Sequence, residues 1–153
     1  MLITSHLAAT VAVSRWLGLS VPELSTALAG GVLLDLDHLV VNGKWFVDVK
    51  NFLRSGIVTH GEVKQHSWLL QEPLCGLIVG ALTGLAVAAW WPQVRWWVFP
   101  FFQGMHIIMD GAMRYRHEPL MPFSRWSYRG WIRSNSKTEL AVSSAILAAI
   151  LLL

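Results

Sequence analysis

The sequence predicts an all-α fold: an integral membrane helical bundle of four to five transmembrane helices, forming one domain over residues 1–153. Composition is the first reason, because 54% of the residues are hydrophobic and only 14% are charged, whereas a soluble domain carries about a quarter charged residues. The second reason is size, because a chain this short cannot bury so many apolar side chains within itself. The third is the recurrence of long apolar segments, whose outward faces a bilayer would solvate.

The first predicted helix covers Leu2–Leu17 and ends at Gly18. His6, Thr10 and Ser14 follow one another at four-residue spacing, so they form one polar stripe along this helix. In lipid, such a stripe should face the other helices.

The second helix should begin near Val21, because Ser20-Val-Pro-Glu23 has the pattern of a capping box with proline in the first turn. Apolar residues continue it through Leu24–Val41, and Asn42-Gly43 should end it.

The clearest predicted span is Pro73–Trp91, nineteen residues without a charge, which is about the length needed to cross a bilayer. Gly76, Gly80 and Gly84 recur at four-residue spacing and should let another helix approach closely. The alternative is that these glycines are scattered by composition alone.

Two further helices are expected, one over Val98 to about Met113 and a shorter one over Glu139–Leu153. The turn before them is rich in aromatic residues, as is typical of a membrane interface. These residues are Trp90, Trp91, Trp96 and Trp97.

The basic residues predict the orientation. Ten of the twelve Lys and Arg residues fall in the connections 43–68 and 114–137, against Arg15 and Arg95 on the other side. The positive-inside rule then places both connections in the cytoplasm, and we expect a multi-pass protein of the cell inner membrane. Within the first connection, Lys44–Arg54 has an apolar face and should lie as an interfacial helix.

The net charge of +3 without a reader motif argues against a nucleic-acid partner, and the single Cys75 excludes an internal disulfide framework.

Histidines and aspartates gather at the predicted cytoplasmic ends of these segments. His106 and Asp110 are spaced i, i+4, so they share a helix face, as paired ligands do in helical zinc sites. Asp35 and His38 are spaced i, i+3 on another helix. The candidate metal ligands are His6, Asp35, Asp37, His60, His66, His106 and Asp110.

Simpler interpretations exist for each candidate. His6 could be an ordinary polar residue at a helix start, and Asp35 with Asp37 could be solvated carboxylates at a helix end. Asp110 could pair with Arg114, four residues later. Histidines in loops are also common.

Histidine and aspartate donors without paired cysteines suit a divalent metal, with zinc favoured and manganese or iron as alternatives. The candidates outnumber the three protein ligands of one catalytic zinc, so the site could hold one or two ions. A two-metal centre suits hydrolysis of phosphate esters. The sequence has no serine-nucleophile elbow and no P-loop.

Five segments match the pattern of a known family in the right order. They are His6, Gly31-Val-Leu-Leu-Asp35-Leu-Asp37-His38, His66-Ser67, Gly104-Met-His106-Ile-Ile-Met-Asp110 and Pro122-Phe-Ser124. In these segments the chain resembles the YdjM-like family of LexA-binding, inner membrane-associated metal-dependent hydrolases. Leu34 stands where that family has proline, and His60 precedes His66 by six residues rather than about five. The ligand order is also similar to that of zinc-dependent phospholipase C, which implies a phosphodiester or lipid-phosphate substrate.

The leading hypothesis is a membrane-embedded metal-dependent hydrolase that acts on a phosphoester or lipid-linked substrate at the cytoplasmic face. Asp37 or His38 would act as general base, and Arg114 or Arg116 would bind a phosphate oxygen. Membrane lipid and an amphipathic, phosphate-bearing substrate are the expected partners. One alternative is an ion or proton transporter, since such pathways also use intramembrane Asp and His. Another is a non-enzymatic adaptor that binds a cytoplasmic protein through its basic loops.

Overall fold

The computed structural model describes residues 2–36, 68–114, 116–132 and 136–152, together with Lys50 and Arg54. Helices predominate in this part of the chain, which confirms the predicted all-α character, although one small hairpin is present. The helices are α1 (Ile3–Trp16), α2 (Val21–Gly31), the 3₁₀ helix η1 (Leu33–Leu36), α5 (Trp68–Gln71), α6 (Pro73–Trp90), α7 (Val98–Gly111) and α8 (Lys137–Leu152), and the strands are β1 (Arg116–His117) and β2 (Tyr128–Arg129).

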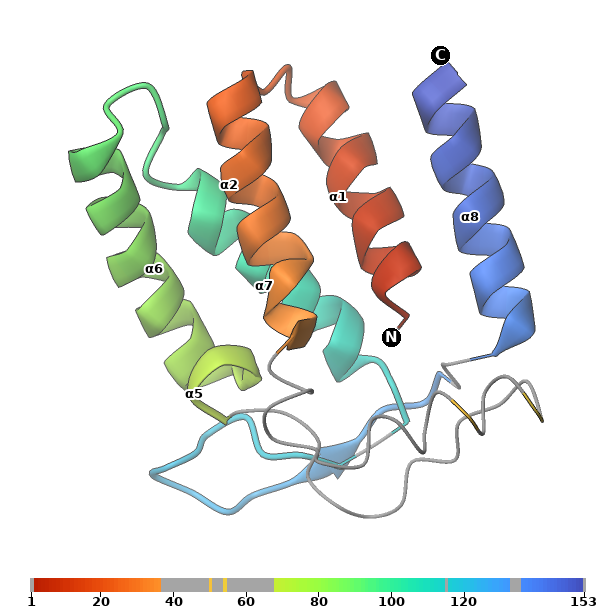
Figure 1. Cartoon of the computed structure of the whole chain (residues 1–153). Helices are drawn as coiled ribbons and strands as arrows, with labels where there is room; N and C mark the ends of the chain where they lie inside the picture. The colour runs from red at the N-terminus through yellow and green to blue at the C-terminus, as the bar shows by residue number, and fades with distance from the viewer. Residues whose placement is uncertain are drawn as a thin grey trace.

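The long helices form a bundle in which α7 packs against both α2 and α6, and α1 packs against both α2 and α8. Figure 1 shows the hairpin beneath this bundle, at the end where α1 and α8 begin. The C-terminal end of α8 lies at the opposite end of the bundle. Residues that follow α7 therefore return to the same end as the start of the chain.

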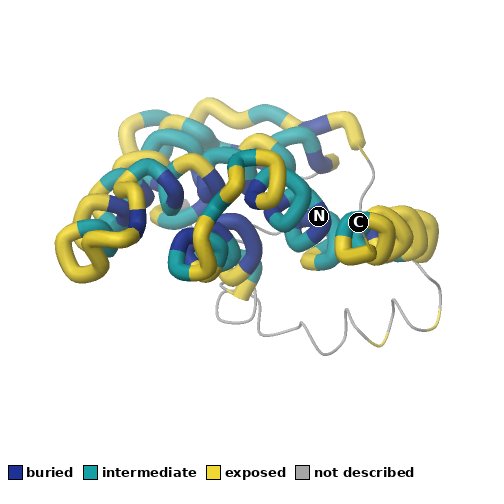
Figure 2. Tube along the Cα trace, turned by 90° about the horizontal axis from the view of Figure 1, so that it is seen from above, coloured by how far each residue is buried: buried dark blue, intermediate teal, exposed yellow. Residues whose placement is uncertain are grey.

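Polar side chains line the contacts between helices. His6, Thr10 and Ser14 are all buried in α1, at 0%, 0% and 3% exposure, so the predicted polar stripe does face the other helices. Large apolar side chains such as Leu82 of α6 and Ile108 of α7 are instead exposed. In Figure 2, exposed and buried positions alternate along the helices. Apolar side chains such as Val98 and Phe102 are also fully buried, so polar and apolar side chains share the interior.

Close packing of α6 on α7 depends on glycine, as predicted. Gly76, Gly80 and Gly84 are the buried residues of α6. A Cβ atom at Gly76 would lie 2.8 Å from Ile107 Cδ1, and one at Gly84 would lie 2.7 Å from Pro100 Cδ. Any side chain at these positions would push the two helices apart.

The second helix begins as predicted but ends early. The Ser20–Glu23 capping box is present, with Ser20 N donating to Glu23 Oε2 at 3.0 Å. The expectation that the helix continues to Val41 is wrong, because α2 ends at Gly31 and a 3₁₀ turn follows. There, Asp35 N donates to Val32 O at 3.2 Å, whereas a continuing α-helix would pair it with Gly31 O. The Gly31 carbonyl is thereby left for a partner on α7.

Helix length supports a membrane span for one element only. Among the described helices, α6 alone is long and apolar enough, with a mean hydropathy of 1.9 and 17% of its residues buried. The other long helices, α1, α2, α7 and α8, have 14, 11, 14 and 16 residues, or about 16–24 Å at 1.5 Å per residue. By length, the predicted bundle of four to five spans is therefore unsupported. Most of the predicted interfacial helix Lys44–Arg54 lies outside the described residues.

The hairpin is the element that the sequence did not predict. β1 and β2 pair antiparallel, with Arg116 opposite Arg129 and His117 opposite Tyr128. The pairing starts next to an isolated bridge between Met113 and Ile132. Strands of two residues carry no detectable period-2 pattern, so the sequence could not indicate them.

Candidate metal centre

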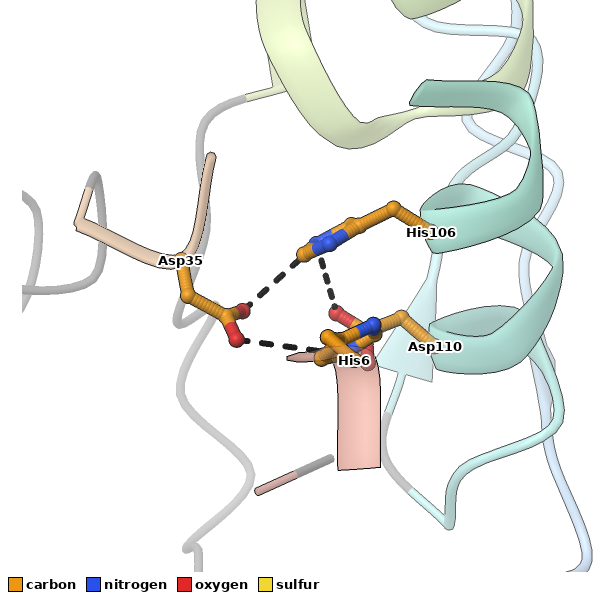
Figure 3. A group of neighbouring side chains, drawn as sticks. All are labelled: His6, Asp35, His106 and Asp110. Atoms are coloured by element: carbon orange, nitrogen blue, oxygen red, sulfur yellow. Dashed lines mark hydrogen bonds and ion pairs between the residues drawn. The ribbon is translucent and has the colours of Figure 1, made fainter. Parts of the chain in front are cut away.

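Four of the predicted ligands meet in one buried cluster. His6 comes from α1, Asp35 from η1, and His106 and Asp110 from α7 (Figure 3). One potential ligand atom from each lies within 4.8 Å of all the others. His6 and His106 are fully buried, and Asp110 is 3% exposed. We call these four residues the His/Asp cluster, and together they could hold a metal ion.

The contacts within the cluster are nearly symmetric. His6 Nε2 lies 3.1 Å from Asp110 Oδ1 and 3.8 Å from Asp35 Oδ2. His106 Nε2 lies 3.4 Å from Asp110 Oδ2 and 3.5 Å from Asp35 Oδ1. Each imidazole therefore faces one oxygen of each carboxylate. These four residues would hold one or two ions through nitrogen and oxygen donors of the kind that zinc binds.

The fold explains why these side chains converge. His106 and Asp110 share one face of α7 through their i, i+4 spacing. His6 belongs to the buried stripe of α1, and its ring stacks on that of His106 with centroids 4.0 Å apart. Asp35 reaches the cluster because α2 ends at Gly31 and η1 redirects the chain. The early end of α2 is thus part of how the site is built.

The contacts of His106 indicate how the cluster could hold a cation. His106 Nδ1 lies 3.1 Å from Gly31 O, and a carbonyl oxygen can only accept, so Nδ1 carries a proton. In the neutral ring, Nε2 then presents a lone pair toward the oxygens of Asp35 and Asp110. Acceptors facing acceptors in a buried site are unfavourable unless a proton or a metal ion lies between them.

Either a proton on His106 Nε2 or a metal ion would satisfy this requirement. Protonating both rings would stack two positive charges at a centroid distance of 4.0 Å. A single cation between the rings and the carboxylates interacts with all four donors at once. The bond from His106 Nδ1 to a backbone carbonyl is also the contact by which metal-binding histidines are usually oriented.

The structure does not describe several of the other predicted site residues. Asp37, His38, His60 and His66 lie outside the described residues. Arg114 is exposed, and among the described ion pairs none joins it to Asp110. The alternative i, i+4 pairing of Asp110 with Arg114 is not seen among the described ion pairs, since α7 ends at Gly111 and Arg114 lies beyond the helix.

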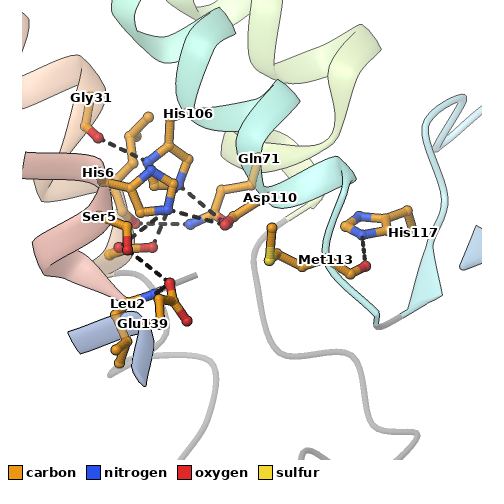
Figure 4. A network of polar contacts seen from close by, with 12 residues as sticks. Leu2, Ser5, His6, Gly31, Gln71, His106, Asp110, Met113, His117 and Glu139 are labelled. Carbon is orange, nitrogen blue, oxygen red and sulfur yellow. Dashed lines mark hydrogen bonds and ion pairs between the residues drawn. The ribbon is translucent and has the colours of Figure 1, made fainter. Parts of the chain in front are cut away.

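Polar residues around the cluster were missed by the sequence analysis. Glu139 Oε1 accepts hydrogen bonds from Leu2 N at 2.9 Å and Ser5 Oγ at 2.8 Å (Figure 4). These bonds tie the start of α8 to the start of α1, next to His6. Gln71 Nε2 donates to Leu34 O at 3.0 Å, which holds η1. The sequence feature that could have indicated a role for Glu139 is its position as a carboxylate at the start of an apolar helix.

Two ionisable side chains away from the His/Asp cluster have shifted pKa values. The phenol of Tyr128 in β2 has a raised pKa, chiefly because it is partly buried and also because the carboxylate of Glu72 is nearby. At the other end of the bundle, the hydrogen bond to Glu23 raises the pKa of the Arg95 guanidinium. Arg95 therefore stays charged throughout the usual pH range.

Comparison with known proteins adds nothing to this geometry: no family model matches the chain, and no curated protein or solved structure matches it significantly. The case for a metal centre therefore rests on the side chains of the His/Asp cluster.

Proposed function

We propose that this chain is a membrane-embedded metal-dependent hydrolase that acts on a phosphoester or lipid-linked substrate at the cytoplasmic face of the inner membrane. The observation that carries the proposal is the buried His/Asp cluster, in which His106 Nε2 lies 3.5 Å from Asp35 Oδ1 and 3.4 Å from Asp110 Oδ2. Zinc is the favoured ion, and manganese or iron would suit the same donors. The resemblance to the YdjM-like hydrolases supports this assignment.

Membrane embedding in several helices is supported by the burial pattern. The apolar side chains of α6 point outward while its glycines pack inward. Exposed aromatic side chains lie near both ends of the bundle, as expected for two interfacial belts. One group comprises Trp16, Trp90, Trp91 and Trp96, and the other comprises Phe123, Trp126 and Trp131. Shorter helices can be accommodated by local thinning of the bilayer.

The chemistry follows from what the residues can hold. A divalent metal in the cluster would act as a Lewis acid and lower the pKa of bound water. Asp37 or His38, close to Asp35 in the sequence, would accept the proton of that water. Arg114 would bind a phosphate oxygen. Burial of His6 and His106 keeps bulk water from competing for the donors.

A transporter is the second candidate, and one observation favours it. The hydroxyl groups of Thr10 and Ser14 are buried and have no hydrogen-bond partner among the described residues. They continue the polar stripe of α1 away from the cluster. Buried polar groups along a helix are also what an ion pathway requires.

Metal content is the decisive measurement. The protein is purified in neutral detergent after supplementation with zinc, manganese or iron, and bound metal is counted by mass spectrometry. We expect one or two ions per chain in the wild type and a large loss in His106→Ala and Asp35→Ala, with Glu23→Gln as a control carboxylate outside the cluster. Absence of metal from the wild type under every condition would refute the proposal.

Measurements of substrate hydrolysis and of metal flux then distinguish the hydrolase, the transporter and the adaptor. A bound metal with hydrolysis of phosphodiester or lipid-phosphate substrates supports the hydrolase. Metal flux into liposomes without hydrolysis would indicate the transporter. A bound metal with neither activity would indicate the adaptor, in which the metal is structural.

A further inference from the structure

A groove runs between α1 and α8. The two helices pack side by side (Figure 1), and the space between them has a volume of about 370 Å³, within the range of about 300–1,000 Å³ that small-ligand sites have. Ala8, Ala9 and Ala12 form the α1 wall with short side chains, and Val142 and Ile146 form the α8 wall. We call this space the α1–α8 groove, and its walls are apolar.

The groove is open along one side. Ala8 and Met113 form its floor at 5% and 1% exposure, whereas Val142 and Ile146 at its rim are 53% and 50% exposed. Its lining covers Ser5–Ala12 of α1, which is about 10 Å of helix at 1.5 Å per residue. An extended apolar molecule would therefore fit the groove, and in a bilayer it would enter sideways from the hydrocarbon.

One end of the groove is polar and adjoins the His/Asp cluster. Ser5 and Glu139 line this end, where Ser5 Oγ donates to Glu139 Oε1 at 2.8 Å. Ser5 directly precedes His6, and Figure 4 shows Ser5 and Glu139 beside the His6 ring. Met113, on the floor, donates its backbone N–H to Asp110 O at 2.8 Å. A molecule that fills the groove therefore ends next to two of the candidate metal ligands.

The charges of the lining indicate which part of a ligand the groove would hold. None of the described lining residues is Lys, Arg or His, and the carboxylate of Glu139 is the charged group among them. Such a lining disfavours a phosphate and suits hydrocarbon. A phosphate would instead be attracted to a divalent metal in the His/Asp cluster. A molecule with a phosphate at one end and a hydrocarbon chain at the other meets both conditions.

We propose that the α1–α8 groove binds one hydrocarbon chain of a phosphate-bearing lipid substrate and so presents the phosphate end to the His/Asp cluster. The inference rests on the proposed hydrolase function and specifies its substrate as a lipid that has an extended chain next to its phosphate. The groove would then select substrates by the length of that chain.

Binding of n-alkyl phosphonates of increasing chain length tests the groove, since their heads cannot be hydrolysed. The full chain in amphipol is titrated by calorimetry, as the wild type and as two double variants. Ala9→Leu/Ala12→Leu fills the groove, whereas Ala145→Leu/Ala148→Leu adds the same volume at exposed positions of α8 that do not line it.

The expected result is a dependence on chain length that only the filled groove abolishes. In the wild type and in the Ala145→Leu/Ala148→Leu control, each added methylene should tighten binding by up to about fourfold, until the chain exceeds the groove. In Ala9→Leu/Ala12→Leu this gain should be lost. The same gain in all three proteins would overturn the proposal, because the chains would then be partitioning into amphipol or onto the general apolar surface.

Cross-linking keeps the test valid if the filled variant does not fold. A wild-type protein labelled with an alkyl phosphonate that carries a diazirine at its chain end should yield adducts on α1 and α8, and adducts on α6 instead would overturn the proposal. The metal is controlled separately with n-alcohols of the same chain lengths. In metal-loaded protein the phosphonate should bind more tightly than the alcohol, and a chelator should remove this preference but not the dependence on chain length. Groove-dependent binding in a protein that holds no metal would support the chain site and refute the proposed hydrolase.

Discussion

Removing the metal from the His/Asp cluster should lower the thermal stability of the protein. Ligand oxygens of Asp35 and Asp110 lie within 4.8 Å of each other, and at an effective dielectric constant of about 20 two unit charges at that distance repel by about 3.5 kcal/mol. A divalent cation among the donors replaces this repulsion with attraction. At roughly 2–4 °C per kcal/mol for a chain of this size, chelation should lower the unfolding midpoint by about 7–14 °C. Tryptophan fluorescence on heating, with and without chelator, measures the shift.

Two carboxylate-to-amide variants make this test specific. Asp35→Asn keeps the volume of the side chain but removes one of the opposed charges, so its metal-free form should be more stable than the metal-free wild type by about 3 kcal/mol. It should also respond little to the chelator. Glu23→Gln alters a buried carboxylate that pairs with Arg95 outside the cluster, and it should keep the full response. A wild-type midpoint that ignores the chelator, or an Asp35→Asn protein as sensitive as the wild type, would refute the reasoning.

Three further predictions concern packing and the membrane. Gly84→Ala should destabilise the protein by about 1–3 kcal/mol through overpacking of α6 on α7, as measured by denaturant unfolding in detergent. Gly104→Ala should be neutral or stabilising, because among the described atoms its Cβ would meet Leu77 Cδ2 alone, at 3.3 Å. Equal effects of the two substitutions would contradict the packing of the two helices. Gly31→Ala should push α2 away from Thr10, since the new Cβ would overlap Thr10 Oγ1, and the added Thr10→Ala change should restore most of the lost unfolding free energy. A double variant no more stable than Gly31→Ala would show that the contact is not the cause. Leu82→Asp, at the exposed middle of α6, should cost about 2.5–3.5 kcal/mol of insertion free energy in a glycosylation-based insertion assay, and unchanged insertion would argue against α6 as a span.

Local sequence patterns correctly predicted the features whose interacting residues are close in sequence. The Ser20–Glu23 capping box starts α2 where expected, and four-residue spacing placed His6 in line with Thr10 on the buried face of α1. His106 and Asp110 meet because both lie on one helix. In each case the geometry of a single helix determines the result, so a sequence period is sufficient information.

Contacts between residues far apart in the sequence determine the features that the sequence could not indicate. Nothing between Leu24 and Val41 stops a helix by composition except the weak helix formers Gly30 and Gly31. Where the chain leaves the α-helix, the Gly31 carbonyl contacts His106, 75 residues away. In the same way, Glu139 bonds to Ser5 across 134 residues. Such long-range partners leave no periodic trace.

The origin of Asp35 has a consequence for how an ion would enter and leave the cluster. His6, His106 and Asp110 project from α-helices that pack within the bundle, so they form a tridentate face that is in place before any ion arrives. Asp35 stands on a single 3₁₀ turn, which can rearrange at lower cost than a long helix. We therefore expect Asp35 to be the first donor to leave when the ion is exchanged, so that its substitution should raise the dissociation rate of the ion.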